Sequence, residues 1–420
     1  FKFMHKISTL DNGLRIVTQN MPSLETVSMG IWNSVGGRDE LENINGVAHL
    51  LEHMAFKGTT KRSALEIAET IENVGGDINA YTSKEITAYY VKLIAEDLPL
   101  GIDILTDILQ NSIFAEKELN RERGVIIQEI GMYLDSPDEM IFDYWQEKAF
   151  PNQPIGRSIL GKTDIIKNIS RDEVRNFMMS HYNPKKMIIS AAGKINHDEF
   201  VESIKQSCTN LPQGTENGRP QASYQPGEYR EQKKLEQIHL LLGFEGIDYH
   251  HDDYYSLMIY SSLLGGGMSS RLFQEIREKR GLVYGISSFS SAYSDTGVFG
   301  IYSGTGDSQI KELIPVLCDQ LNTSPDSITE KEISRGKAQL KASLLMGRES
   351  AFRRCEIAAR QLIVFNRVIE PTEILKKIDE VNIETVKHIA KQIVSQPITI
   401  SSIGPIENLE TLDKIQARLN

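Results

Sequence analysis

Two histidines and a glutamate stand close together in the run His49-Leu50-Leu51-Glu52-His53. On an α-helix, residues four apart share one face with their Cβ atoms ~6 Å apart, so both imidazoles can reach one metal ion. Glu52 can then reach a water molecule at the metal without being a ligand itself. The pattern predicts a zinc site with an adjacent general base. The alternative is an amphipathic helix that carries these residues by chance.

A catalytic zinc ion usually has three protein ligands and one open position, so the two histidines require a third group. The segment Glu116–Leu134 is expected to form a helix that offers Glu122 and Glu129. They are seven residues apart, nearly two full turns, and therefore share one stripe. Most helical glutamates are solvated surface charges. Here apolar neighbours predict a buried Glu129, and a buried carboxylate needs a partner such as a metal ion. These neighbours are Val125, Ile126, Ile127 and Ile130.

The elements that must position these groups follow from the hydrophobic pattern and the turn residues. Asn45-Gly46 predicts a helix start just before the histidines. The expected strands are Leu14–Thr18, Thr26–Trp32 and Ile86–Leu93. The expected helices are Val47–Phe56, Ser63–Val74, Leu98–Asn111 and Glu116–Leu134. Strands and helices mix without strict alternation, which favours the α+β class over a doubly wound sheet.

The chain is long enough for two domains. Between 211 and 237 the composition shifts to Pro, Gly, Gln, Glu and Lys, which predicts a linker between a zinc-binding catalytic domain at 1–210 and a second domain at 238–420. The two halves also share short segments in corresponding places, which indicates a duplicated domain. The pairs are Ala115–Leu119 with Thr329–Ile333 and Met187–Gly193 with Ile398–Gly404. We expect each domain to be a mostly antiparallel sheet packed with helices.

Composition limits the partners and the compartment. The net charge of -11 argues against nucleic acid. The three cysteines, Cys208, Cys318 and Cys355, form no C-x-x-C pair, so a reducing compartment is expected. The sequence contains no run of 18 apolar residues, so no membrane-spanning helix is expected. The polar stretch at its start is too short to be a signal peptide. We therefore favour a bacterial cytoplasm, with the mitochondrial matrix after trimming of a leader as the alternative.

The run from His49 to Thr59, followed by Glu122 and Glu129, resembles the pitrilysin family of metallopeptidases, which are inverted zincins. Within it, the chain is most similar to the mitochondrial processing peptidase β subunits and their bacterial relatives, over its whole length. The resemblance implies a zinc endopeptidase with one Zn²⁺ per chain. His49, His53 and Glu129 would be the ligands. Glu52 would be the general base, and Glu122 a second acidic residue that supports the site.

In the second half, the resemblance implies roles for Arg277 and Tyr284, which follow the glycine run at 265–267. The family uses such a pair to hold the substrate backbone and the developing oxyanion. The alternative is a helical arginine and a core tyrosine. A nucleotide-binding protein is disfavoured, because no Gly-Lys-Ser/Thr follows the glycines.

Substrate-binding positions also match the family. Asn79 and Ala80 lie in a segment similar to its edge strand, which pairs with an extended peptide. Phe56 stands where processing peptidases present an aromatic wall to the residue after the cut. Glu139 and Asp143 match an acidic pair that recognises arginine, for which two carboxylates are suited. An exposed acidic helix face is the alternative for this pair.

The resemblance implies cleavage of short or extended peptides, basic and presequence-like, inside the chamber of a dimer. The chain resembles half of a full-length family member, and the partner can be an identical or a different chain. A non-catalytic peptide-binding or structural subunit of the same fold is the alternative function. The natural substrate and the preferred cleavage site cannot be predicted from these residues.

Overall fold

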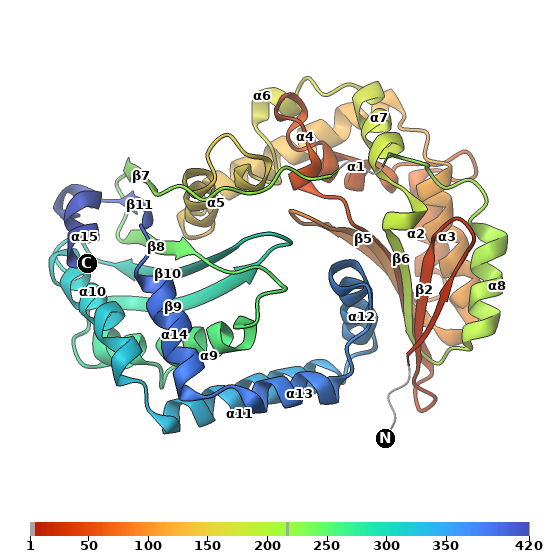
Figure 1. Cartoon of the computed structure of the whole chain (residues 1–420). Coiled ribbons are helices and arrows are strands. Elements are labelled where there is room, and N and C mark those ends of the chain that lie inside the picture. Colours follow the sequence, from red (N-terminus) through yellow and green to blue (C-terminus); the bar gives the residue numbers. More distant parts are fainter. Residues whose placement is uncertain (1–4, 216–217, 420) are drawn as a thin grey trace. The chain divides into compact units, whose positions relative to one another are not determined.

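The structure is a computed structural model that describes residues 5–215 and 218–419. The chain forms two compact units, each built from one sheet and several helices (Figure 1). Unit 1 takes its described residues from 1–132, 157–220 and 345–370. Unit 2 takes them from 133–156, 221–344 and 371–420. The predicted α+β class is confirmed.

The sheet of unit 1 has the strand order β1-β2-β6-β3-β5-β4. Only β2 and β6 are parallel neighbours, and the other pairs are antiparallel. One face of this sheet packs against a core that includes Leu50, Ile108 and Phe177 from three helices. The strands are β1 (Lys6–Thr9), β2 (Arg15–Asn20), β3 (Thr26–Asn33), β4 (Asp77–Thr82), β5 (Thr87–Ile94) and β6 (Met187–Gly193).

The sheet of unit 2 repeats this topology in the order β7-β11-β8-β10-β9. Its one parallel pair, β7 and β11, corresponds to β2 and β6, and its edge strand β9 corresponds to β4. The shared topology confirms the predicted duplication. The strands are β7 (Gly227–Gln232), β8 (Ile238–Glu245), β9 (Val283–Ala292), β10 (Gly297–Thr305) and β11 (Thr399–Gly404).

Each half of the chain gives one helix to the sheet of the other half. Helix α5 (Pro137–Ala149) packs on the sheet of unit 2, where Trp145 Nε1 donates a 2.8 Å hydrogen bond to the carbonyl of Thr399. Helix α12 (Ala351–Phe365) packs on the sheet of unit 1, where Ser190 Oγ donates a 2.7 Å hydrogen bond to the carbonyl of Cys355.

The compact units therefore differ from the predicted division into 1–210 and 238–420. The predicted linker at 211–237 is only partly a connection between the sheets, because strand β7 (Gly227–Gln232) of the second sheet lies within it. Its positions 216 and 217 lie outside the described residues. The physical reason for the difference is that each sheet buries apolar side chains on both faces, and the second face is covered by a helix from the other half. An amphipathic pattern shows that a helix has an apolar face, but it does not identify the sheet that this face covers.

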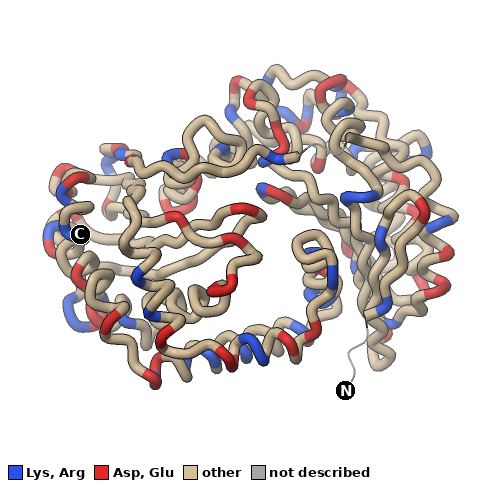
Figure 2. The backbone as a smooth tube through the Cα atoms, in the orientation of Figure 1, with Lys and Arg blue, Asp and Glu red and all other residues tan. Residues whose placement is uncertain are grey.

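The remaining α-helices complete the two units. Lys and Arg are interspersed with Asp and Glu along both of them (Figure 2). Among the described residues, no helix combines the length and the apolar character that a membrane crossing requires. In unit 1 the remaining helices are α1 (Val47–Ala55), α2 (Ala64–Glu72), α3 (Leu98–Gln110), α6 (Thr163–Ile166), α7 (Arg171–His181) and α8 (His197–Ser207). In unit 2 they are α9 (Tyr254–Gly265), α10 (Ile310–Ser327), α13 (Pro371–Glu380), α14 (Ile383–Val394) and α15 (Leu412–Arg418). Helices α4 (Glu116–Leu134) and α11 (Glu330–Gly347) each end at a boundary between the units.

Candidate metal centre

Helix α1 carries both histidines on the side that faces away from the core. Its apolar residues, among them Leu50, Leu51 and Met54, are fully buried in the core of unit 1. The 3.6-residue period of the helix then places His49, Glu52 and His53 together on the half-buried side. The helix lies where the sequence predicts it, one residue shorter at its end.

The side chains of His49, His53 and Glu129 converge. One ligand atom from each lies within 4.8 Å of the other two. The Nε2 atoms of His49 and His53 are each 3.8 Å from a carboxylate oxygen of Glu129. Two ligands at the usual zinc distances in a tetrahedral site are roughly 3.4 Å apart. Two imidazoles and one carboxylate are also a donor set of catalytic zinc sites, so these residues fit the metal that the sequence predicts.

The burial of Glu129 differs from the sequence expectation. The side chain of Glu129 is 39% exposed, whereas that of Glu122 is 7% exposed. The prediction of a buried Glu129 is wrong because Val125, one of its apolar neighbours, is itself 39% exposed. The core-facing side of α4 carries Glu122, and Glu129 lies at its rim, open towards the histidines.

Glu122 is a hydrogen-bond partner of one of these histidines. Its Oε2 lies 2.9 Å from Nδ1 of His53, and its Oε1 lies 2.8 Å from Nζ of Lys57. Burial acts to raise the pKa of Glu122, but the contacts with Lys57 and His53 outweigh it and leave the pKa lowered. An ionised Glu122 accepts the Nδ1 proton of His53 and so turns the Nε2 lone pair towards Glu129. Lys57 was missed from the sequence, although it stands one helical turn after His53.

Glu52 lies beside the end of edge strand β4. Its Oε2 accepts a short hydrogen bond from Oγ1 of Thr82, the last residue of the strand. Burial raises the pKa of Glu52, and the hydrogen bond from Thr82 and the charge of His53 partly oppose this shift. A carboxylate with a raised pKa is a stronger base, which suits proton transfer near neutral pH. Thr82 was not singled out from the sequence.

Strand β4 has an open edge next to α1. Among the described strands it pairs only with β5, so its outer edge has no neighbouring strand and is the side at which a further strand could pair. Asn79 and Ala80 lie in the middle of β4, and Oδ1 of Asn79 accepts a 2.8 Å hydrogen bond from the Ala80 N–H. Phe56 follows the last residue of α1, and its ring centroid is 6.1 Å from that of Tyr89 on β5. The structure thus brings the three predicted peptide-binding residues of unit 1 into the same unit as the metal cluster.

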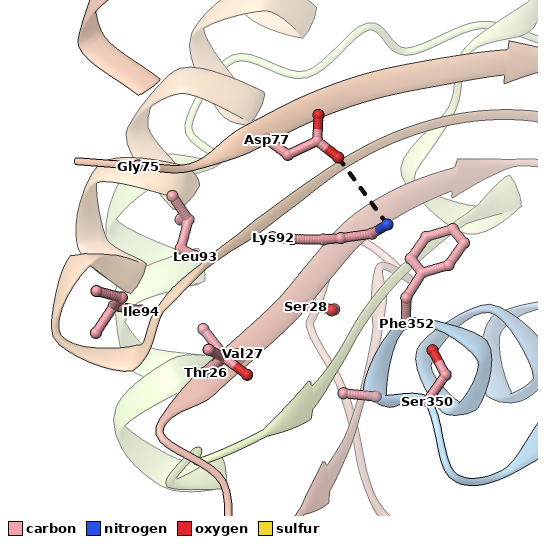
Figure 3. A pocket seen from close by; sticks show the side chains of 11 residues that line it. Thr26, Val27, Ser28, Gly75, Asp77, Lys92, Leu93, Ile94, Ser350 and Phe352 are labelled. Atoms are coloured by element: carbon pink, nitrogen blue, oxygen red, sulfur yellow. Dashed lines mark ion pairs between the residues drawn. The ribbon is translucent and has the colours of Figure 1, made fainter. Parts of the chain in front are cut away.

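A cavity of about 370 Å³ opens at the other end of β4, where the strand begins (Figure 3). Asp77 and Lys92 are directly opposite each other on β4 and β5, with 3.9 Å between their charged atoms. The ammonium of Lys92 also lies 4.9 Å from the ring centroid of Phe352, at the start of α12. Glu52 and this cavity therefore lie at opposite ends of β4.

The other predicted residues belong to unit 2. Nε of Arg277, which lies in the short π-helix η6 (Phe273–Glu278), donates a 2.9 Å hydrogen bond to the carbonyl of Tyr284. Tyr284 is 79% exposed, so the alternative of a core tyrosine is wrong. Glu139 and Asp143 lie one turn apart on α5 at a solvent-accessible position. Arg277 and Tyr284 therefore form a contacting pair, whereas Glu139 and Asp143 share one face of α5.

Comparison with known proteins adds an independent finding. Residues 15–163 match the Insulinase (Peptidase family M16) domain, and residues 168–340 match the Peptidase M16 inactive domain. The uncharacterized zinc protease YmxG of Bacillus subtilis is 36% identical over 97% of this chain and 100% of its own length. The human mitochondrial-processing peptidase subunit beta is 35% identical over 99% of this chain and 87% of its own length.

Solved structures share the fold. A protease from Helicobacter pylori superposes with a TM-score of 0.88 at 25% identity, covering 96% of this chain and 99% of the other. A Peptidase M16 inactive domain protein from Pseudomonas fluorescens has the same TM-score at 19% identity, covering 97% and 99%, and supports the fold alone.

Proposed function

Because this chain belongs to the M16 family of peptidases, we propose that it is a zinc-dependent endopeptidase with one zinc ion per chain. The observation that carries the proposal is the convergence of His49, His53 and Glu129 beside the half-buried carboxylate of Glu52. The three converging residues are the proposed ligands.

The residues of the chain divide the chemistry between them. His49, His53 and Glu129 would hold the zinc ion, which when bound would supply a Lewis acid for the carbonyl group and for a water molecule. Glu52 takes a proton from the attacking water and delivers it to the leaving amine. Glu122 holds the tautomer and the orientation of His53. Arg277 and Tyr284 stabilise the negative charge that develops on the carbonyl oxygen.

The proposed substrate is an extended peptide that adds to the open edge of β4. Such pairing uses backbone hydrogen bonds, so it binds many sequences with similar strength. Phe56 contacts the side chain that follows the cut. Glu139 and Asp143 favour an arginine near the cut, so basic, presequence-like peptides are the preferred class.

We further propose that two chains assemble around the substrate, with Arg277 and Tyr284 of one chain serving the metal centre of the other. The test mixes two inactive variants, Glu52→Gln and Arg277→Ala. If the residues act across chains, the mixture regains activity that neither variant has alone. No regain in mixtures that exchange subunits would contradict this assembly.

The first experiment on the function measures cleavage of a quenched basic peptide that contains arginine. Wild type is assayed with and without a chelator, beside Glu52→Gln. Cleavage that the chelator stops and the variant lacks is the expected result.

A non-catalytic peptide-binding subunit is the second candidate, and the match of residues 168–340 to an inactive domain favours it. The same match is also expected of one active chain in which the first half is catalytic and the second half, which contains the inactive domain, supports it. A zinc-loaded wild type that binds the peptide without cleaving it would select the non-catalytic function.

A further inference from the structure

The helix that carries the two histidines begins without a capping side chain of its own. Its first position is preceded by Gly46, which has a φ of 98°, a conformation that favours glycine. A Cβ atom at this position would lie 2.9 Å from the carbonyl oxygen of Leu160 and 2.5 Å from a methyl carbon of Ile166. Gly46 therefore cannot be replaced by the serine, threonine or aspartate that usually accepts the first N–H groups of a helix.

Glu40 supplies the missing acceptor from outside the helix. Its Oε2 accepts a 2.9 Å hydrogen bond from the Gly46 N–H, and its Oε1 accepts a 2.8 Å hydrogen bond from the Ala48 N–H. Nδ2 of Asn45 donates a further 2.9 Å hydrogen bond to Oε2. All three partners are donors, which a carboxylate with two acceptor oxygens can satisfy. When Glu40 is ionised, its negative charge also lies at the positive end of the helix.

The surroundings of Glu40 hold this carboxylate in place. Glu40 is only 2% exposed. Nη2 of Arg157 donates a 2.6 Å hydrogen bond to the backbone carbonyl of Glu40, and Nδ2 of Asn45 donates a 3.0 Å hydrogen bond to the carbonyl of Ser158. The Glu40 carboxylate thus ties the start of α1 to the residues before it, and the hydrogen bonds of Arg157 and Asn45 tie the same region to the segment at 157–158.

We propose that Glu40 is a positioning residue of the metal centre, whose carboxylate fixes the first turn of α1 and thereby the geometry of its two histidines. Ala48, which donates to Glu40, immediately precedes His49. A shift of the first turn therefore moves the His49 ring relative to His53 and Glu129. This inference rests on the proposed zinc function.

The test measures the zinc affinity of the full chain by competition with a chromophoric chelator, in wild type and in Glu40→Gln. Glutamine has one acceptor oxygen, and its amide group would face one of the two backbone N–H donors. We expect zinc affinity to fall at least about tenfold, the lower end of losses at residues that orient metal ligands. In the peptidase assay kcat falls while KM stays within about twofold, because the change acts through the metal and not through the peptide.

Asp39→Asn is the matched control. Asp39 is also a poorly accessible acid next to Glu40, but its carboxylate pairs with Arg219 at 2.9 Å and accepts from the Gly36 N–H rather than from the N–H groups at the start of α1. We expect this variant to bind zinc about as tightly as wild type. Glu40→Asp keeps the charge on a shorter side chain and should give an intermediate loss of affinity.

Four results separate the possibilities. Unchanged zinc affinity in folded Glu40→Gln would overturn the proposal, as would an equal loss in Asp39→Asn, since general loosening of the loop would then be the cause. If the glutamine variant does not fold, Glu40→Asp decides, and wild-type affinity in that variant overturns the proposal. A wild-type chain that binds no zinc would instead refute the proposed function.

Discussion

Replacement of Glu122 by glutamine tests how the two glutamates of α4 divide their roles. Glu122 contacts Nδ1 of His53 at 2.9 Å and Nζ of Lys57 at 2.8 Å, so it reaches the metal centre only through a histidine. Glutamine keeps the size of the side chain and one acceptor, but it loses the charge that balances Lys57. Such changes next to a ligand typically weaken metal affinity roughly 10- to 100-fold, which is about 1.4 to 2.7 kcal/mol.

Glu129→Gln is the comparison for this prediction. Glu129 offers its carboxylate directly to the two Nε2 atoms, so its loss removes a charged ligand and should cost more than the Glu122 change. Zinc affinity of both variants is measured by competition with a chelator at one pH, with circular dichroism as the check on folding. We expect wild type to bind most tightly, Glu122→Gln to be intermediate and Glu129→Gln to be weakest.

The reverse order would refute this reasoning. If Glu122→Gln lost more affinity than Glu129→Gln, the buried glutamate would be the ligand and the exposed one the accessory residue. Equal affinity in wild type and Glu122→Gln would show that the contact with His53 does not contribute to metal binding.

Four further predictions concern the site and the stability of the units. Glu52→Gln should keep its zinc, measured by metal analysis, and lose at least about 100-fold in kcat, the lower range for loss of a general base. His53→Ala should lose the metal, and retained zinc would contradict its assignment as a ligand. Trp145→Ala should lower the free energy of unfolding by about 3 to 5 kcal/mol in urea denaturation, because this fully buried side chain anchors α5 on the sheet of unit 2. Burial raises the pKa of Glu40 to about 7, so the folded chain binds an extra proton between about pH 4.5 and 7. Its contribution therefore makes the free energy of unfolding fall as pH rises through that window, and Glu40→Gln should flatten the dependence.

The metal cluster could be predicted from the sequence because its main determinant is local. The spacing of His49 and His53 is a property of one helix, and α1 forms where its apolar period and Asn45-Gly46 predict it. The seven-residue spacing likewise placed Glu122 and Glu129 on one stripe. Their burial could not be predicted, because it depends on which part of that stripe rests on the core, and the apolar run around Glu129 reaches the rim.

Residues that act through distant segments were missed for a related reason. Glu40 caps α1 from a loop, and Thr82 meets Glu52 from the end of a strand 30 positions later in the chain. Neither stands at a helical or strand spacing from its partner. The exchange of α5 and α12 was missed because an apolar helix face fits either of two similar sheets.

The exchange of α5 and α12 between the two halves affects when unit 1 can finish folding during synthesis on the ribosome. The face of the first sheet that carries Val17, Trp32 and Ile188 is covered by α12, which ends at Phe365. About 145 residues separate that helix end from residue 220, where the earlier part of unit 1 stops. At about 5 to 20 residues per second, the apolar face stays open for roughly 7 to 29 s. Unit 1 is begun first, yet it can be completed only after most of unit 2 has been synthesised.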